Sequence, residues 1–97
     1  QFDFTQDAAH IHNWVRGMNP WPVAWFAQDG KRIKVLECRL AENAQNATPG
    51  TVLALKPLTI AAANGAVALL TVTPEGGKPM AGTAWAAGRR LKAGDSL

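Results

Sequence analysis

Side chains that could carry out catalysis or hold a metal are few in this sequence, and their spacing keeps them apart. His10 and His12 lie two positions apart in an expected helix. Their side chains therefore point about 200° away from each other and cannot share a metal as an i, i+4 pair does. Cys38, the single cysteine, lies in an apolar stretch, where a structural thiol is more common than a nucleophile. Residues 76–78 read Gly-Gly-Lys but lack the spaced glycine and the Ser or Thr of a phosphate loop. The sequence predicts no catalytic, nucleotide or metal site in this chain.

The basic residues are a more informative group. The chain has 10 Lys and Arg against 7 Asp and Glu, a net charge of +3, which is compatible with an RNA partner without requiring one. Guanidinium and ammonium groups pair with phosphate oxygens, and such contacts carry no sequence preference. The candidate phosphate-binding residues are Lys31, Arg32, Lys34, Arg39, Lys78, Arg89, Arg90 and Lys92. The alternative for each of them is an ordinary solvated surface charge.

One helix is expected near the N-terminus, from Asp7 to Gly17. Asp7 can accept hydrogen bonds from the first free backbone N–H groups, and Gly17 favours a helix end. Apolar residues at three- and four-residue spacing form one stripe for burial: Ala8, Ile11, Trp14, Val15 and Met18. The Asn-Pro-Trp-Pro that follows, residues 19–22, predicts an extended connector in which Trp21 packs as a plug.

Beyond the connector the pattern changes to strands joined by tight turns. Asp29-Gly30 and Asn64-Gly65 are two-residue hairpin signals. The expected strands are residues 23–28, 31–41, 51–55, 59–63 and 66–72. Alternation in the second strand slips at Leu36, which predicts a bulge. Trp25 and Phe26 are adjacent on the first strand, so only one can face the interior. The other is available to stack on a base or to cover a neighbouring domain.

Five or six short strands, an N-terminal helix and a short C-terminal helix, expected at residues 81–88, predict a mainly β fold. This arrangement suits a small oligonucleotide-binding-type (OB-like) antiparallel barrel. With a length of 97 and 47% hydrophobic residues, residues 1–97 are expected to form a single globular domain. No apolar run reaches the roughly 20 residues of a membrane span. The start at Gln1 lacks the order of a signal peptide and favours a fragment or a processed chain.

Five segments, taken in order, resemble the C-terminal domain of methionyl-tRNA formyltransferases. They are Ile11–Pro22 with its Asn-Pro-Trp-Pro, Gly30–Val35, Thr48–Leu53, Gly77–Met80 and Gly88–Leu97. Their order and spacing hold from about Phe4 to Leu97, which is nearly the whole chain. The resemblance implies a non-catalytic, OB-like module that helps to bind and orient initiator methionyl-tRNA in translation initiation.

The resemblance also implies what the parent enzyme does. A catalytic N-terminal domain would precede Gln1, and there 10-formyltetrahydrofolate would donate a formyl group to the methionyl amine of initiator tRNA. This chain would hold no cofactor, its basic residues would contact tRNA phosphates, and the enzyme would be cytoplasmic. Two alternatives stay open. One is the same module in a related folate-dependent formyltransferase or formyltetrahydrofolate hydrolase that acts on a small molecule. The other is a stand-alone barrel that binds proteins.

Overall fold

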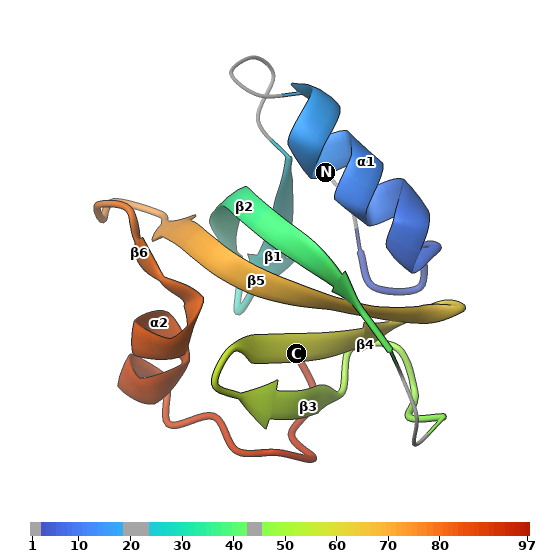
Figure 1. The fold of residues 1–97 in the computed structure, drawn as a ribbon. Coiled ribbons are helices and arrows are strands. Elements are labelled where there is room, and N and C mark those ends of the chain that lie inside the picture. The colour runs from blue at the N-terminus through green and yellow to red at the C-terminus, as the bar shows by residue number, and fades with distance from the viewer. Residues whose placement is uncertain (1–2, 19–23, 43–45) are drawn as a thin grey trace.

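The computed structural model describes residues 3–18, 24–42 and 46–97. The connector at 19–22, with the expected plug Trp21, lies outside these ranges. In chain order the elements are α1 Ala8–Met18, β1 Trp25–Gln28, β2 Lys31–Ala41, β3 Val52–Leu55, β4 Leu58–Ala62, β5 Gly65–Pro74, β6 Met80–Ala81 and α2 Gly82–Gly88 (Figure 1). The prediction of a mainly β chain with a helix near each end is confirmed.

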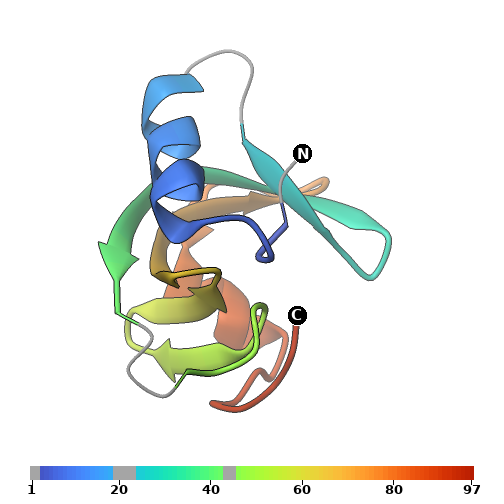
Figure 2. The ribbon, with the colours of Figure 1, turned by 90° about the vertical axis from the view of Figure 1, so that its right-hand side faces the viewer.

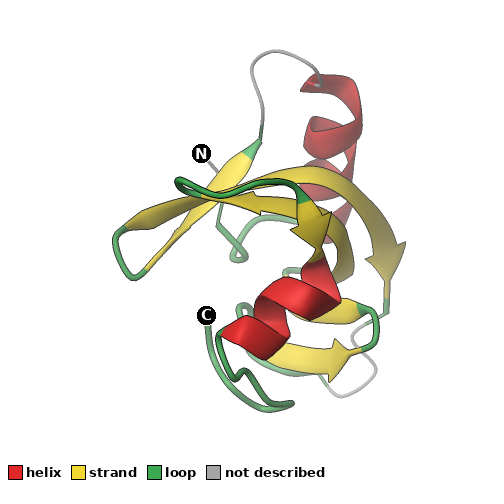
Figure 3. Cartoon of the chain, turned by 90° about the vertical axis from the view of Figure 1, so that its left-hand side faces the viewer, coloured by secondary structure: helices red, strands yellow, loops and turns green. Residues whose placement is uncertain are grey.

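The strands of the described residues belong to one antiparallel sheet, in the order β1-β2-β5-β4-β3, with β6 paired to β5. The sheet curls around the core, as Figure 2 and Figure 3 show. It does not close into a complete barrel, because no ladder joins β1 to β3 among the described residues. The C-terminal end of the chain instead covers the edge of β3. There the Gly94 N–H donates to the Val52 carbonyl at 2.7 Å, and the Leu97 N–H donates to the Gly50 carbonyl at 2.8 Å.

Local turn chemistry produces both predicted hairpins. Between β1 and β2, Asp29 and Gly30 adopt φ values of 52° and 77°, the left-handed pair that an Asp-Gly turn accommodates. The second hairpin joins β4 to β5, but its turn lies one residue earlier than expected. Ala62 pairs with Gly65, so Gly65 belongs to the strand and Asn64 is the second turn residue. Asn64 takes a positive φ of 59°, which asparagine tolerates better than most residues.

The predicted bulge at Leu36 is confirmed. Val35 pairs with Val72, and the next paired residue is Glu37, opposite Thr71, which leaves Leu36 as the extra residue of β2. A bulge bends its strand and increases the local twist. Figure 3 shows the consequence, since the β1–β2 hairpin projects from one side of the curled sheet.

The apolar stripe of α1 packs against the sheet as its spacing predicted. Ala8, Ile11 and Val15 are buried, with at most 4% of each residue exposed. Trp14 is half-buried and packs against the same core. The side chain of Met18 lies outside the described part of the structure.

Three aromatic rings join the N-terminal segment, β1 and α2 at one end of the core. Phe26 of β1 meets Phe4 edge to face, with ring centroids 5.1 Å apart. It meets Trp85 of α2 in the same manner at 6.0 Å. All three residues are buried, so these contacts add to the apolar area removed from water.

Candidate nucleic-acid interface

The outward face of the β1–β2 hairpin carries a tryptophan and two cations. Phe26 and Ile33 are 2% and 3% exposed, so they form the inward face, and their neighbours on each strand point outward. Trp25 pairs with Lys34, and Lys34 pairs with Thr73 of β5. These three residues form one row across three strands. The sequence left open which of the two adjacent aromatic residues faces the core, and the structure places Phe26 there.

Arg32 lies on the same outward face, one step closer to the turn. Its guanidinium carbon lies 4.5 Å from the centroid of the Trp25 ring, which is a cation–π contact. Its backbone N–H donates to Glu75 Oε1 at 3.2 Å. Arg32 and Lys34 line a surface hollow together with Thr73 and the turn at Gly76 and Gly77.

A second hollow, on the opposite face of the hairpin beside Ile33, brings two more of the predicted cations together. Lys31 and Arg89 both line it, and Glu75 lines both hollows. Arg89 also forms an ion pair with Asp29 in the β1–β2 turn. The two side chains are 33% and 72% exposed, so the pair contributes little to stability, on the order of 0–1 kcal/mol. Its structural effect is to hold Arg89, from the end of α2, beside the β1–β2 hairpin.

The other predicted cations are exposed but scattered. Arg39 lies on the far half of β2, opposite Ala68. Lys78 lies in the loop between β5 and β6, and Arg90 and Lys92 lie in the segment after α2. The structure therefore brings Lys31, Arg32, Lys34 and Arg89 to the two hollows of one hairpin, and neither hollow is lined by Arg39, Lys78, Arg90 or Lys92. Phosphate binding by any of them stays a prediction.

Two residues of this region were not singled out by sequence reasoning. Thr73 and Glu75 line the hollows because β5 runs antiparallel beside β2, and Glu75 reaches back to the backbone of Arg32. No local spacing signals that pairing, since it joins residues 43 positions apart. The sequence predicts a turn at Asp29, but the ion pair between Asp29 and Arg89 depends on where the end of α2 lies in the fold.

The titratable groups of the described residues do not assemble a reactive centre. No group of three or more His, Cys, Asp or Glu able to hold a metal occurs among them. Burial, and to a lesser extent the charge of Glu37, raises the pKa of the Cys38 thiol to about 11. The thiol is therefore protonated near neutral pH, which does not suit a nucleophile.

Asp7 acts as the expected helix cap. The Ala9 N–H donates to Asp7 Oδ1, and the Asn64 amide donates to Asp7 Oδ2, each at 2.9 Å. The bond from Asn64, followed by the bond from Ala9, holds the pKa of the Asp7 carboxyl below its usual value. Asp7 thus joins α1 to the β4–β5 turn, which is a structural role.

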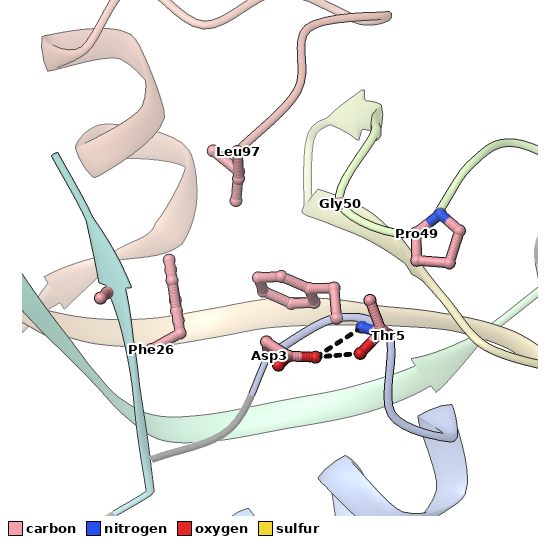
Figure 4. A pocket seen from close by; sticks show the side chains of 8 residues that line it. Asp3, Thr5, Phe26, Pro49, Gly50 and Leu97 are labelled. Carbon is pink, nitrogen blue, oxygen red and sulfur yellow. Dashed lines mark hydrogen bonds between the residues drawn. The ribbon is translucent and has the colours of Figure 1, made fainter.

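A further hollow lies at the open side of the sheet, between the N-terminal segment and the C-terminal end (Figure 4). Phe26, Pro49, Gly50 and Leu97 line it together with Asp3. The carboxylate of Asp3 already accepts hydrogen bonds from the backbone N–H and the hydroxyl of Thr5. The hollow therefore combines apolar walls with a carboxylate that already has its hydrogen-bond partners in Thr5.

Known proteins resemble this chain along its length. The family model of the formyl transferase C-terminal domain matches residues 1–90. A methionyl-tRNA formyltransferase of Solibacter usitatus is 39% identical over 97 residues, which cover 100% of this chain and 31% of that protein. A protein of the same name from Streptococcus pyogenes is 41% identical over 101 residues, covering 100% of this chain and 32% of the relative. Another from Cereibacter sphaeroides is 45% identical over 78 residues, which cover 80% of this chain and 24% of the relative. The chain thus spans at most about a third of the length of these curated relatives. No helix among the described residues is long and apolar enough to cross a membrane.

Proposed function

This chain belongs to the formyl transferase C-terminal domain family. We propose that residues 1–97 form one domain, and that this domain binds tRNA in a methionyl-tRNA formyltransferase. The catalytic domain precedes this chain in that enzyme and works in the cytoplasm. It transfers a formyl group from 10-formyltetrahydrofolate to the methionyl amine of initiator tRNA. Two observations support this division into a catalytic domain and a tRNA-binding domain: the relatives are named methionyl-tRNA formyltransferase, and they are longer than this chain.

The chain itself takes no part in the formyl transfer. Among its described residues no group of three or more His, Cys, Asp or Glu able to hold a metal occurs, and the Cys38 thiol is protonated near neutral pH. We therefore expect the purified chain to transfer no formyl group from 10-formyltetrahydrofolate to methionyl-tRNA. Measurable transfer by this chain alone would contradict its assignment as a binding module.

The observation that carries the proposal is the group of cations at the β1–β2 hairpin. Arg32 and Lys34 share one hollow, and Lys31 and Arg89 share a second hollow on the other face of the hairpin. Cations grouped in this way can neutralise several neighbouring phosphates of one RNA strand and release their counterions. The contacts position the RNA without reading its sequence. A tRNA held by this hairpin would present its acceptor end to the catalytic domain at a raised effective concentration.

The remaining cations are proposed as outer contacts. Arg39, Lys78, Arg90 and Lys92 are all exposed, so each is free to meet a phosphate of a large ligand such as tRNA. None of them lines either hollow of the hairpin, so we treat each as a separate contact. We therefore expect single substitutions at these four positions to weaken tRNA binding less than substitutions at Arg32 or Lys34.

Charge reversal at the hairpin tests the proposal. Arg32→Glu combined with Lys34→Glu removes two phosphate contacts, and each contact contributes roughly 0.9 to the slope of log affinity against log salt. We expect weaker binding of initiator and elongator tRNA alike, and a salt slope shallower by about 2. Fluorescence anisotropy of labelled tRNA at several salt concentrations measures both quantities.

A matched control separates local contacts from net charge. Lys34→Glu and Lys56→Glu change the net charge equally, but Lys56 lies exposed in the turn between β3 and β4, away from both hollows. We expect Lys34→Glu to weaken binding clearly more than Lys56→Glu does. Equal effects of the two variants, or unchanged binding in the double variant, would favour the module of a small-molecule formyltransferase instead.

A further inference from the structure

The outward face of the hairpin contains a stacking surface as well as charges. Trp25 is half-buried, and it presents its ring on the side of the sheet opposite to the core. The guanidinium of Arg32 lies over that ring at 4.5 Å. Both groups are flat, and unpaired RNA bases stack on aromatic rings and on arginine planes alike. A tryptophan held in this way serves as a fixed platform, because its strand and the arginine above it restrict its motion.

The hollow lined by Arg32 and Lys34 lies directly beside this platform. Lys34 pairs with Trp25 on one side and with Thr73 on the other, and neighbouring strands lie only about 4.8 Å apart. The far wall of the hollow is the turn at Gly76 and Gly77. A Cβ added at Gly76 would meet nothing within 4 Å, whereas one at Gly77 would meet Pro74 Cγ at 3.0 Å, so the wall leaves room for a ligand to approach the backbone at Gly76.

We propose that this face binds one unpaired RNA nucleotide, with its base on the Trp25–Arg32 platform and its phosphate in the hollow beside Lys34. The proposal rests on the proposed function for its ligand class, which is RNA, and adds the form of RNA that is bound. The bases of a duplex are stacked on each other, so they cannot lie flat on this platform. The subsite therefore selects a loop, a bulge or a strand end, and it tolerates any base because every base has a π face.

Glu75 limits the negative charge of the ligand that this subsite can bind. Its carboxylate lines the hollow between Arg32 and the glycine turn and accepts a hydrogen bond from the Arg32 backbone. The facing charges are thus the two cations Arg32 and Lys34 and the one anion Glu75. A net excess of one positive charge suits one phosphate rather than two adjacent phosphates.

Substitution at Trp25 separates stacking from charge. The 97-residue chain is titrated with a fluorescently labelled six-nucleotide single-stranded RNA and with an RNA duplex, each at three salt concentrations. We expect Trp25→Leu to bind the single strand about 5- to 150-fold more weakly, the range for losing one stacked base. Its salt slope should equal that of the wild type, because no phosphate contact is removed. Trp25→Phe keeps a ring and should restore most of the affinity, while duplex binding stays unchanged in both variants.

A second variant tests the subsite even if Trp25→Leu does not fold. Glu75→Gln removes the anion of the subsite and leaves its platform intact, so we expect single-strand affinity to rise several-fold more than duplex affinity. Equal gains for the two RNAs, or wild-type binding of the single strand by Trp25→Leu, would overturn the subsite. If the wild-type chain binds neither RNA, the proposed function fails. If it binds both RNAs and Trp25 has no effect, only the subsite fails.

Discussion

Gly82, the first residue of α2, is a position where the fold leaves no space for a side chain. A Cβ built on its backbone would lie 2.0 Å from the Leu69 carbonyl oxygen and 3.0 Å from the Leu69 carbonyl carbon. An ordinary carbon–oxygen contact is about 3.3 Å or longer. Gly82→Ala therefore requires the start of α2 and strand β5 to move apart by about 1.3 Å.

The cost of that movement follows from what would have to shift. Both clashing atoms belong to the backbone of β5, so no side chain can rotate away. Overpacking of this kind costs about 1–3 kcal/mol, and occasionally more. The shift would also move Trp85 of the same helix, which is 4% exposed and packs edge to face on Phe26. The required backbone shift puts the cost near the upper end of that range, about 3 kcal/mol. Alanine favours helix over glycine by up to about 1 kcal/mol, so we expect a net loss of about 2 kcal/mol.

Gly88, the last residue of the same helix, provides the control. A Cβ added there meets nothing within 4 Å, so Gly88→Ala gains helix propensity without a clash. We expect a change between zero and about 1 kcal/mol in favour of the folded state. Urea unfolding followed by far-ultraviolet circular dichroism measures both variants against the wild type. If Gly82→Ala and Gly88→Ala differ by less than about 0.5 kcal/mol, the tight approach of α2 to β5 is wrong.

Three further predictions follow from the core and from two titratable groups. Phe26→Ala removes the ring between Phe4 and Trp85 and should cost about 3–5 kcal/mol in urea unfolding; a loss under about 1 kcal/mol would place Phe26 outside the core. The pKa of Cys38 is raised from 9.0 to about 11, so iodoacetamide at pH 8 should label the folded chain about 100-fold more slowly than the urea-unfolded chain, and similar rates would contradict the burial of the thiol. The pKa of Asp7 is lowered from 3.8, so its stabilising contribution is complete above that pH and is lost as the pH falls through the lower folded value. Replacing Asn64, which donates the main hydrogen bond to Asp7, with Ala should weaken this acid dependence of unfolding, and an unchanged dependence would contradict the role of Asn64.

The elements defined by local chemistry could be predicted from the sequence. The Asp29-Gly30 turn, the bulge at Leu36 and the stripe of α1 depend on residues within a few positions of each other. The turn at Asn64 was predicted one residue too late, because Gly65 has a φ of 155° and pairs with Ala62 within the ladder. Glycine as a turn signal does not distinguish the last turn residue from the first residue of the strand.

The arrangement of the candidate site depended on contacts that spacing cannot reveal. Lys34 meets Thr73 and Arg32 meets Glu75 because β2 pairs with β5, a strand distant in sequence, as well as with β1. Charge alone suggested Lys31, Arg32, Lys34 and Arg89 as candidates, but it did not predict that they gather at one hairpin, and it suggested Arg39 equally, which the length of β2 carries away from the hairpin. β6 was not predicted either, since its two residues, Met80 and Ala81, have no strand pattern and pair with β5 through tertiary contact.

We propose that this chain holds tRNA through phosphate contacts. The most direct measurement is a titration of the 97-residue chain with initiator tRNA and with an elongator tRNA across a series of salt concentrations. With about three to five phosphates neutralised, we expect weak binding of both tRNAs alike, with affinity falling as the salt concentration to a power of about −3 to −5. No measurable binding at low salt, or an affinity that does not change with salt, would contradict it.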